Sequence, residues 1–289
     1  MKKRACLSVG VIFIIMLAVL VYPLMPGDYD PLSISLSTFV QLYSGLGLLT
    51  VIPAMLWLLR NIKYPTSNVG SDHLLLKRRI YLKLYFWSTF TVLLLATVIT
   101  AFALSFLLGL FSFIALIVVT RTMHKKISDS KSRLLYSYCL PSSLGLLPVL
   151  PFVLLLIFDK PITNWSRNKA IQNSYELIDE IEGYRDRKGS YPLTLNAINK
   201  DYSTGISGIE KYYYTYDNTT YNVYFEQPRF FTYEFGTREF VVYNPDDRHL
   251  MMSHVAWHML LEPYQIRNAQ GWYESIETGI PHWKSFLFD

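Results

Sequence analysis

Two histidines and a glutamate near the C-terminus are spaced so that they could hold a metal ion. His254, His258 and Glu262 follow one another at intervals of four residues, so on a helix they would share one face and could bind zinc. The spacing differs from the His-Glu-x-x-His pattern of zinc proteases. A hairpin signal leads into this segment, and an extended chain would separate the three side chains. We therefore expect ordinary polar or packed histidines here, with no bound metal and no cofactor.

A group of carboxylates is the second candidate for chemistry. Asp179, Glu180 and Glu182 could form a general acid–base pair, but they stand in a helical pattern beside Arg185 and Arg187. Charges of both signs at this spacing usually form a solvated helix face. The sequence contains no serine in a nucleophile-elbow motif and no glycine-rich phosphate loop. We expect a non-enzymatic protein, with an extracytoplasmic enzyme as a lower-ranked alternative.

The apolar sequence is concentrated in the first half of the chain. Residues 1–158 contain long apolar runs, whereas residues 160–289 have the mixed composition of a soluble domain. Because a helix needs about 20 apolar residues to cross a membrane, the pattern predicts a multi-pass α-helical region with five spans. The expected spans cover residues 5–24, 36–59, 83–100, 103–120 and 134–158.

The charges follow the same division of the chain. The net charge of +5 is the sum of +10 over residues 1–158 and −5 over residues 159–289. Segments 60–83 and 121–133 hold six and five Lys and Arg, so the positive-inside rule places them and the N-terminus in the cytoplasm. The C-terminal domain is then extracytoplasmic, or periplasmic, on a plasma (inner) membrane protein. Because this domain is acidic, we expect no nucleic-acid partner.

Groups that usually mark a transport pathway are scarce inside the expected spans. Apart from Lys83 at the edge of one span, the spans contain no Asp, Glu, Lys, Arg or His, although proton and ion pathways usually need such residues. The two cysteines, Cys6 and Cys139, lie at span ends, which excludes a disulfide framework in the C-terminal domain. We expect the spans to anchor the protein in the lipid bilayer. A transporter or its accessory subunit, working through backbone carbonyls and proline-broken helices, is the alternative.

The C-terminal half predicts one long helix followed by antiparallel strands. Apolar residues recur at helical spacing from Asn164 to Arg187, and Pro161 is expected to separate this helix from the last span. Gly189 then permits a chain reversal. Tyrosine-rich runs flank turn residues at 217–220, and a second strand pair is expected around 236–238. A helix followed by a meander of strands predicts an α+β domain.

The turn after the helix carries a resemblance to a known family. A helix, then Gly189, Tyr191, Pro192 and Leu195 in the order Gly-x-Tyr-Pro-x-Thr-Leu, then antiparallel strands, resembles the globular domains of type II secretion pseudopilins and type IV pilin-like proteins. The matching stretch is about residues 169–224. The resemblance implies a pilin-like fold with no catalytic residue.

The chain also departs from the pilin pattern. True pilins have a single N-terminal span continuous with the helix of the globular domain, a prepilin cleavage site and an early glutamate. Here four expected spans precede, no cleavage site is visible, and Pro161 is expected to break the helix. The resemblance therefore implies a pilin-like domain reused on a membrane anchor, in place of a filament subunit made by the usual route.

Tyrosine is the outstanding residue of the C-terminal half, which contains 14 of the 22 tyrosines. Tyr212, Tyr213 and Tyr214 are consecutive in an expected strand, so alternate side chains must point to opposite faces. Tyrosine is favoured at recognition surfaces, but it also simply suits strands. The function that we expect is partner binding or envelope and secretion assembly by the outer domain, with an envelope or secretion-system protein as the partner.

Overall fold

A computed structural model describes most of the C-terminal half of the chain and parts of the N-terminal half. The described residues are 2–50, 139–198, 202–216, 219–230, 237–249 and 273–288, with short stretches between 87 and 121 and the pairs 251–252 and 260–261. The chain forms two compact units. Unit 1 contains residues 1–20 and 35–158, and unit 2 contains residues 21–34 and 159–289.

The helices of unit 1 correct the expectation of five membrane spans, which is wrong. Among the described helices, one stretch, Val149–Lys188, is long and apolar enough to cross a membrane by length and composition. The other apolar helices found among the described residues, Gly10–Leu24, Phe90–Ile99 and Gly109–Val118, have 10–17 residues there. A hydropathy pattern counts apolar residues, whereas a span also requires that they belong to one sufficiently long helix.

Helix α2 (Ser33–Gly47) follows α1 (Lys2–Val21) and covers the first part of the second expected span. The rest of that span, residues 51–59, lies outside the described residues. Buried polar side chains interrupt the apolar surface of α2: the Ser37 hydroxyl donates to the Leu20 carbonyl oxygen at 2.6 Å, and the Gln41 amide donates to Ser37 Oγ at 3.2 Å. The first of these bonds joins α2 to α1, and the second lies within α2.

Helix α6 runs without a break from Cys139 to Lys188. The expected break at Pro161 is therefore wrong. Proline removes one backbone hydrogen bond and disfavours a helix interior, but the turns after Pro161 are held by burial of Ser166, Ala170 and Ile171. The same helix thus contains an apolar part, 139–158, and a part that belongs to unit 2.

The sheet of unit 2 has five antiparallel strands in the order β1-β2-β3-β7-β6, and a separate strand pair joins β4 to β5. The strands are β1 (Tyr213–Tyr216), β2 (Tyr221–Gln227), β3 (Arg238–Tyr243), β4 (Met251–Met252), β5 (Leu260–Leu261), β6 (Tyr273–Glu277) and β7 (Trp283–Phe288). The long helix with an antiparallel sheet is confirmed, as is the hairpin of β1 and β2. The second expected hairpin is wrong, because β3 pairs with β2 and β7.

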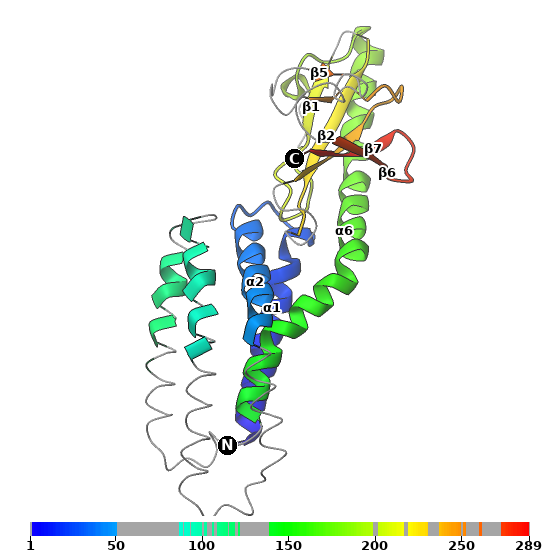
Figure 1. Cartoon of the computed structure of the whole chain (residues 1–289). Helices are drawn as coiled ribbons and strands as arrows, with labels where there is room; N and C mark the ends of the chain where they lie inside the picture. The colour runs from blue at the N-terminus through cyan, green and yellow to red at the C-terminus, as the bar shows by residue number, and fades with distance from the viewer. Residues whose placement is uncertain are drawn as a thin grey trace, which may run out of the picture. The chain divides into compact units, whose positions relative to one another are not determined.

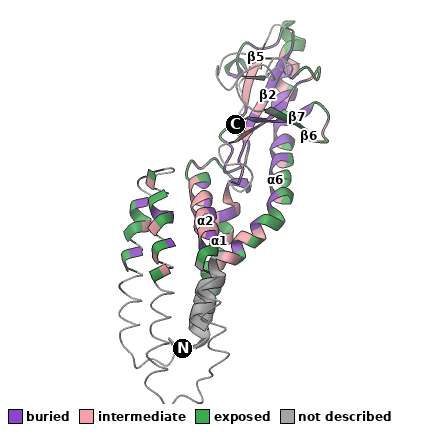
Figure 2. Ribbon diagram, viewed as in Figure 1, coloured by how far each residue is buried: buried purple, intermediate pink, exposed green. Residues whose placement is uncertain are grey.

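The core of unit 2 lies between α6 and one face of the sheet, here called the inner face (Figure 2). Helix residues three or four apart point toward the strands, as amphipathic periodicity requires. Alternate strand residues meet them. The largest fully buried side chains on the two elements include Ile171, Ile181, Tyr221, Phe225 and Trp283. Burying each such side chain contributes roughly 1.5–3 kcal/mol, so this contact holds the domain together.

A short segment from the other end of the sequence completes unit 2. Residues 21–34, here called the docked loop, form backbone hydrogen bonds with the loop at 204–209. Gly27 donates to the Gly205 carbonyl, Ser207 donates to Met25, and Gly208 donates to Pro23, each at 2.9 Å. The sequence does not indicate this pairing, because backbone hydrogen bonds with a distant loop leave no pattern in side-chain types.

Candidate functional site

The candidate metal ligands His254, His258 and Glu262 lie outside the described residues. Within the part of the chain that the structure describes, no group of three His, Cys, Asp or Glu residues could hold a metal ion. Of the carboxylates considered for acid–base chemistry, Glu182 contacts the sheet: the Tyr221 hydroxyl donates to its Oε1 at 2.7 Å. Glu180 forms a surface ion pair with Arg187 at 3.7 Å.

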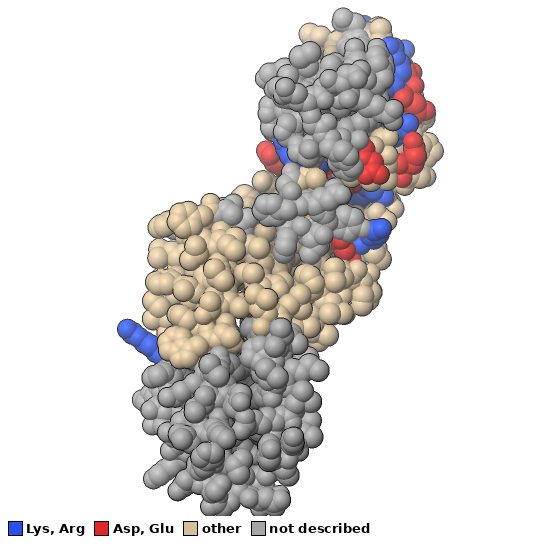
Figure 3. Space-filling view, viewed as in Figure 1, with Lys and Arg blue, Asp and Glu red and all other residues tan. Residues whose placement is uncertain are grey.

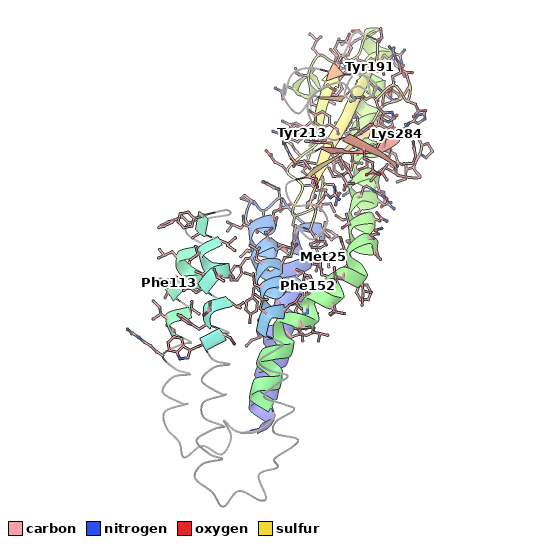
Figure 4. All side chains as sticks on the ribbon, viewed as in Figure 1. Met25, Phe113, Phe152, Tyr191, Tyr213 and Lys284 are labelled. Atoms are coloured by element: carbon pink, nitrogen blue, oxygen red, sulfur yellow. The ribbon has the colours of Figure 1, made fainter. Side chains whose placement is uncertain are left out.

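The Gly-x-Tyr-Pro turn packs firmly on the end of α6. Gly189 has φ +76°, a left-handed conformation that favours glycine, and its amide donates to the Arg185 carbonyl at 2.7 Å. Tyr191, labelled in Figure 4, is buried, and its hydroxyl accepts a hydrogen bond from Arg185 Nη1 at 2.6 Å. The Pro192 carbonyl accepts from the Tyr214 hydroxyl at 2.7 Å. The turn is therefore held by hydrogen bonds to both α6 and β1.

The last residue of the motif also packs inward. Leu195 is buried, whereas Leu193 two positions earlier is 78% exposed. Leu195 begins a short 3-10 helix, Leu195–Ala197.

The three consecutive tyrosines separate into different environments. Tyr212 is buried before β1 begins, and its hydroxyl donates to the Ala170 carbonyl of α6 at 2.5 Å. Tyr214 lies on the inner face, where its ring is 5.7 Å from that of Tyr221. Tyr213 is on the opposite, outer face, as the alternation of strand side chains requires. Of the three expected recognition residues, Tyr213 is the one on the outer face.

On the outer face, Tyr213 belongs to a row of three rings, one from each of three neighbouring strands. Tyr213 of β1 stacks on Tyr224 of β2 with ring centroids 5.4 Å apart and an angle of 20°. Tyr224 in turn meets Phe240 of β3 edge-on at 6.3 Å. All three side chains are partly exposed, and Figure 4 shows Tyr213 on the side of the strands away from α6. We call these residues the outer aromatic ladder.

Cations flank both ends of the outer aromatic ladder. The Arg238 guanidinium lies 4.9 Å from the Phe240 ring centre, and Lys211 Nζ lies 5.4 Å from that of Tyr213. Each cation has a carboxylate neighbour: Arg238 pairs with Glu226 and Lys211 with Glu210. The ladder is therefore an apolar strip bordered by balanced charges, a composition typical of protein recognition surfaces.

The ladder hydroxyls do not ionise under physiological conditions. Burial raises the pKa of Tyr224 to about 12. Burial, together with the bond that the Tyr213 hydroxyl donates to Glu210, raises the pKa of Tyr213 well above its usual value. Neutral phenols donate hydrogen bonds and supply apolar area, but they do not act as general bases or nucleophiles. This chemistry suits binding.

A second group of polar residues lies at the inner face, and all of its members except the partly exposed Arg229 are buried. Its members are Ser166 and Arg167 on α6, Gln227 at the end of β2, Arg229, Glu239 on β3 and Ser285 on β7. We call them the inner polar cluster. Glu239 Oε1 accepts from the Ser285 hydroxyl at 2.5 Å. Arg167 Nη1 and Arg229 Nε lie 3.8 and 3.7 Å from its two carboxylate oxygens. The sequence did not reveal this cluster, because its members are far apart along the chain.

A buried histidine links two turns at the other end of β3 and β7. His249 Nδ1 lies 3.0 Å from the Asp247 carbonyl oxygen, and its Nε2 lies 3.1 Å from that of His282. Burial lowers the pKa of His249, although these two carbonyl contacts oppose the shift. Asp247, His249 and His282 have φ values of 56°, 24° and 66°, and they are the positive-φ non-glycine residues among those described.

Charge is distributed unequally between the described surfaces of the two units. Figure 3 shows red and blue side chains gathered on unit 2, whereas the described surface of unit 1 is mostly uncharged. Because its rings are partly exposed and bordered by charged residues, the outer aromatic ladder is the candidate binding surface. The inner polar cluster is a second candidate site. No family model, curated protein or solved structure matches this chain, so its function must be argued from its own residues.

Proposed function

We propose that this chain is a non-enzymatic membrane protein that presents unit 2 outside the cytoplasm and binds a partner protein through the outer aromatic ladder. The partner that we propose is a protein of envelope or secretion assembly. The observation that carries the proposal is the continuity of α6, because one helix holds both an apolar stretch and the helix of the sheet domain.

The apolar part of α6 supports membrane anchoring. Leu156, Ile157 and Phe158 are exposed apolar residues at its end. Trp165, also largely exposed, follows within two turns, where an indole ring suits the headgroup layer. The preceding segment 121–133 holds five Lys and Arg, whereas residues 159–289 have a net charge of −5. This asymmetry favours an extracytoplasmic unit 2.

The arrangement of α6 and the sheet also supports a pilin-like reading of unit 2. Pilin-like domains place the second half of a long helix against an antiparallel sheet, and here Ala170, Ile171 and Ile181 of α6 are buried against strands β2, β3 and β7. The helix is continuous with the apolar stretch, so one expected departure from the pilin pattern does not apply. The proposal is a pilin-like presenting domain, and it assigns no catalytic residue.

The outer aromatic ladder is the part of unit 2 best suited to recognition. Tyrosine and phenylalanine bury a large area while fixing only two side-chain torsions each. Tyr213 and Tyr224 are already stacked, so little conformational entropy is lost when a partner covers them. Arg238 and Lys211 border the strip and can orient the partner through polar contacts at its rim.

The experiment is site-specific photo-crosslinking in living cells. A photoreactive phenylalanine at position 213 should give a discrete crosslinked protein, and the same probe at Tyr175, an exposed tyrosine on α6, should not. Replacing Tyr224 and Phe240 by serine should abolish the product, and Tyr175→Ser should leave it unchanged. Equal products from positions 213 and 175, or none from position 213, would refute recognition by the ladder.

A further inference from the structure

Three side chains of the inner polar cluster are buried with atoms that have no hydrogen-bond partner. These atoms are both amide atoms of Gln227, the hydroxyl oxygen of Ser166 and Nε of Arg167. Gln227 is 2% exposed, Ser166 is fully buried and Arg167 is 9% exposed. Leaving a buried donor unpaired is unfavourable, so native proteins place a water molecule, an ion or a ligand atom against such groups.

These groups face one another across the contact between helix and sheet. Ser166 and Arg167 are neighbours on α6, and Arg167 reaches Glu239 of β3. Gln227 is the cross-strand partner of Glu239, so both side chains are on the inner face. The unpartnered atoms therefore come from two elements that are packed on each other.

The chemistry of the atoms selects the ligand. Arg167 Nε, Ser166 Oγ and the Gln227 amide nitrogen are donors, whereas Gln227 Oε1 is an acceptor, so the ligand must offer several acceptor oxygens and one hydroxyl group. The guanidinium groups of Arg167 and Arg229 add positive charge, and their planar donors fit a tetrahedral oxyanion. The nearby carboxylates of Glu239 and Asp159 make a singly charged anion preferable to a doubly charged one.

We propose that the inner polar cluster binds a phosphate group carrying one negative charge. Arg167, Ser166 and Gln227 donate hydrogen bonds to its oxygens, and Arg229 supplies a second guanidinium. Two sources share this chemistry, namely dihydrogen phosphate in solution and the phosphodiester of a phospholipid headgroup. Only the headgroup source depends on the proposed membrane anchoring. It is considered because Ser166 follows the apolar stretch of α6 by only eight residues.

The test uses the full chain in detergent micelles and follows its thermal unfolding. One arm titrates sodium phosphate at pH 6 against sodium chloride at equal ionic strength. A second arm compares micelles that contain phosphatidylglycerol with micelles that contain diacylglycerol, which lacks the phosphate. We expect one of these additions to raise the melting temperature in a saturable way. Stabilisation by phosphate identifies the free anion, and stabilisation by phosphatidylglycerol alone identifies the headgroup.

Variants assign the effect to the cluster. Gln227→Leu should weaken the apparent affinity about tenfold or more, which corresponds to a lost hydrogen bond to a charged group. Gln172→Leu makes the same change on the exposed face of α6 and should leave the affinity unchanged. If Gln227→Leu does not fold, Ser166→Ala provides the smaller change. Absence of stabilisation in both arms, or equal stabilisation of wild type and cluster variants, would overturn the proposal and leave an adventitious ion or bound water only.

Discussion

The amide nitrogen of Gly208 donates to the carbonyl oxygen of Pro23 at 2.9 Å. This bond joins the docked loop to the loop at 204–209, and the two backbones approach closely. A Cβ built on Gly208 would lie 2.5 Å from the Pro23 oxygen and 2.9 Å from Pro228 Cγ. Contacts this short with backbone and ring atoms are not tolerated, so only glycine fits at position 208.

Gly208→Ala should therefore destabilise the protein by about 1–3 kcal/mol, the usual cost of overpacking a tight contact. Gly183→Ala is the matched control, because Gly183 is within α6 and faces only the flexible end of Arg187. That change should be neutral or stabilising by up to about 1 kcal/mol. Chemical denaturation of the full chain measures both. Equal midpoints for Gly208→Ala and wild type would show that the docked loop is not held at this position.

Because the composition changes at residue 159, we expect residues 160–289 to fold alone, and we expect the docked loop to stabilise that fragment further. A domain of this size can bury enough apolar surface to fold. The loop adds four backbone hydrogen bonds to the contact at 204–209, so a peptide of residues 21–34 should bind the fragment and raise its melting temperature. A fragment with no cooperative transition would refute independent folding, and a fragment unaffected by the peptide would refute docking.

The Gly-x-Tyr-Pro turn should be necessary for stability. Gly189 has φ +76° with no atom within 4 Å of a built Cβ, so any cost of substitution comes from its backbone conformation. Gly189→Val should cost roughly 1–2 kcal/mol, whereas Gly189→Asn should cost less, because asparagine tolerates this conformation. Tyr191→Ala should cost about 3 kcal/mol or more, since it removes a buried ring. Denaturation midpoints equal to wild type for Gly189→Val and Tyr191→Ala would contradict this role.

The pH dependence of stability should report on His249. Burial lowers its pKa in the folded protein below the ordinary 6.5, so the unfolded chain binds the proton more readily. The stabilisation is present above pH 6.5 and is lost as pH falls through and below that value, by at most about 1.4 kcal/mol per pH unit. His249→Asn should flatten the decline between pH 7.5 and 5, because asparagine does not titrate and tolerates positive φ. An unchanged slope in that variant would show that another group is responsible.

The sequence predicted the C-terminal half of the chain better than the apolar N-terminal half. Helical periodicity and strand alternation indicated the helix, the turn at Gly189 and the β1–β2 hairpin, because each is a local pattern. The break predicted at Pro161 is wrong, because the local cost of the proline is offset by the turns that follow it, in which Ser166 and Ala170 are fully buried. Of the outer aromatic ladder, the sequence indicated only Tyr213. Tyr224 and Phe240 are aligned with it by the register between strands, which a local pattern does not give. The inner polar cluster depends on the same long-range pairing.

The central claim, that α6 carries unit 2 out of the membrane on the side away from the cytoplasm, has one direct test. Residues 159–289 contain no cysteine, so Tyr175→Cys introduces a single thiol into the domain at a position that is 46% exposed. A membrane-impermeant maleimide is applied to sealed right-side-out vesicles, with the unsubstituted chain as the control for Cys6 and Cys139. We expect the variant to be labelled before the vesicles are opened. Labelling that appears only after the vesicles are lysed would contradict it.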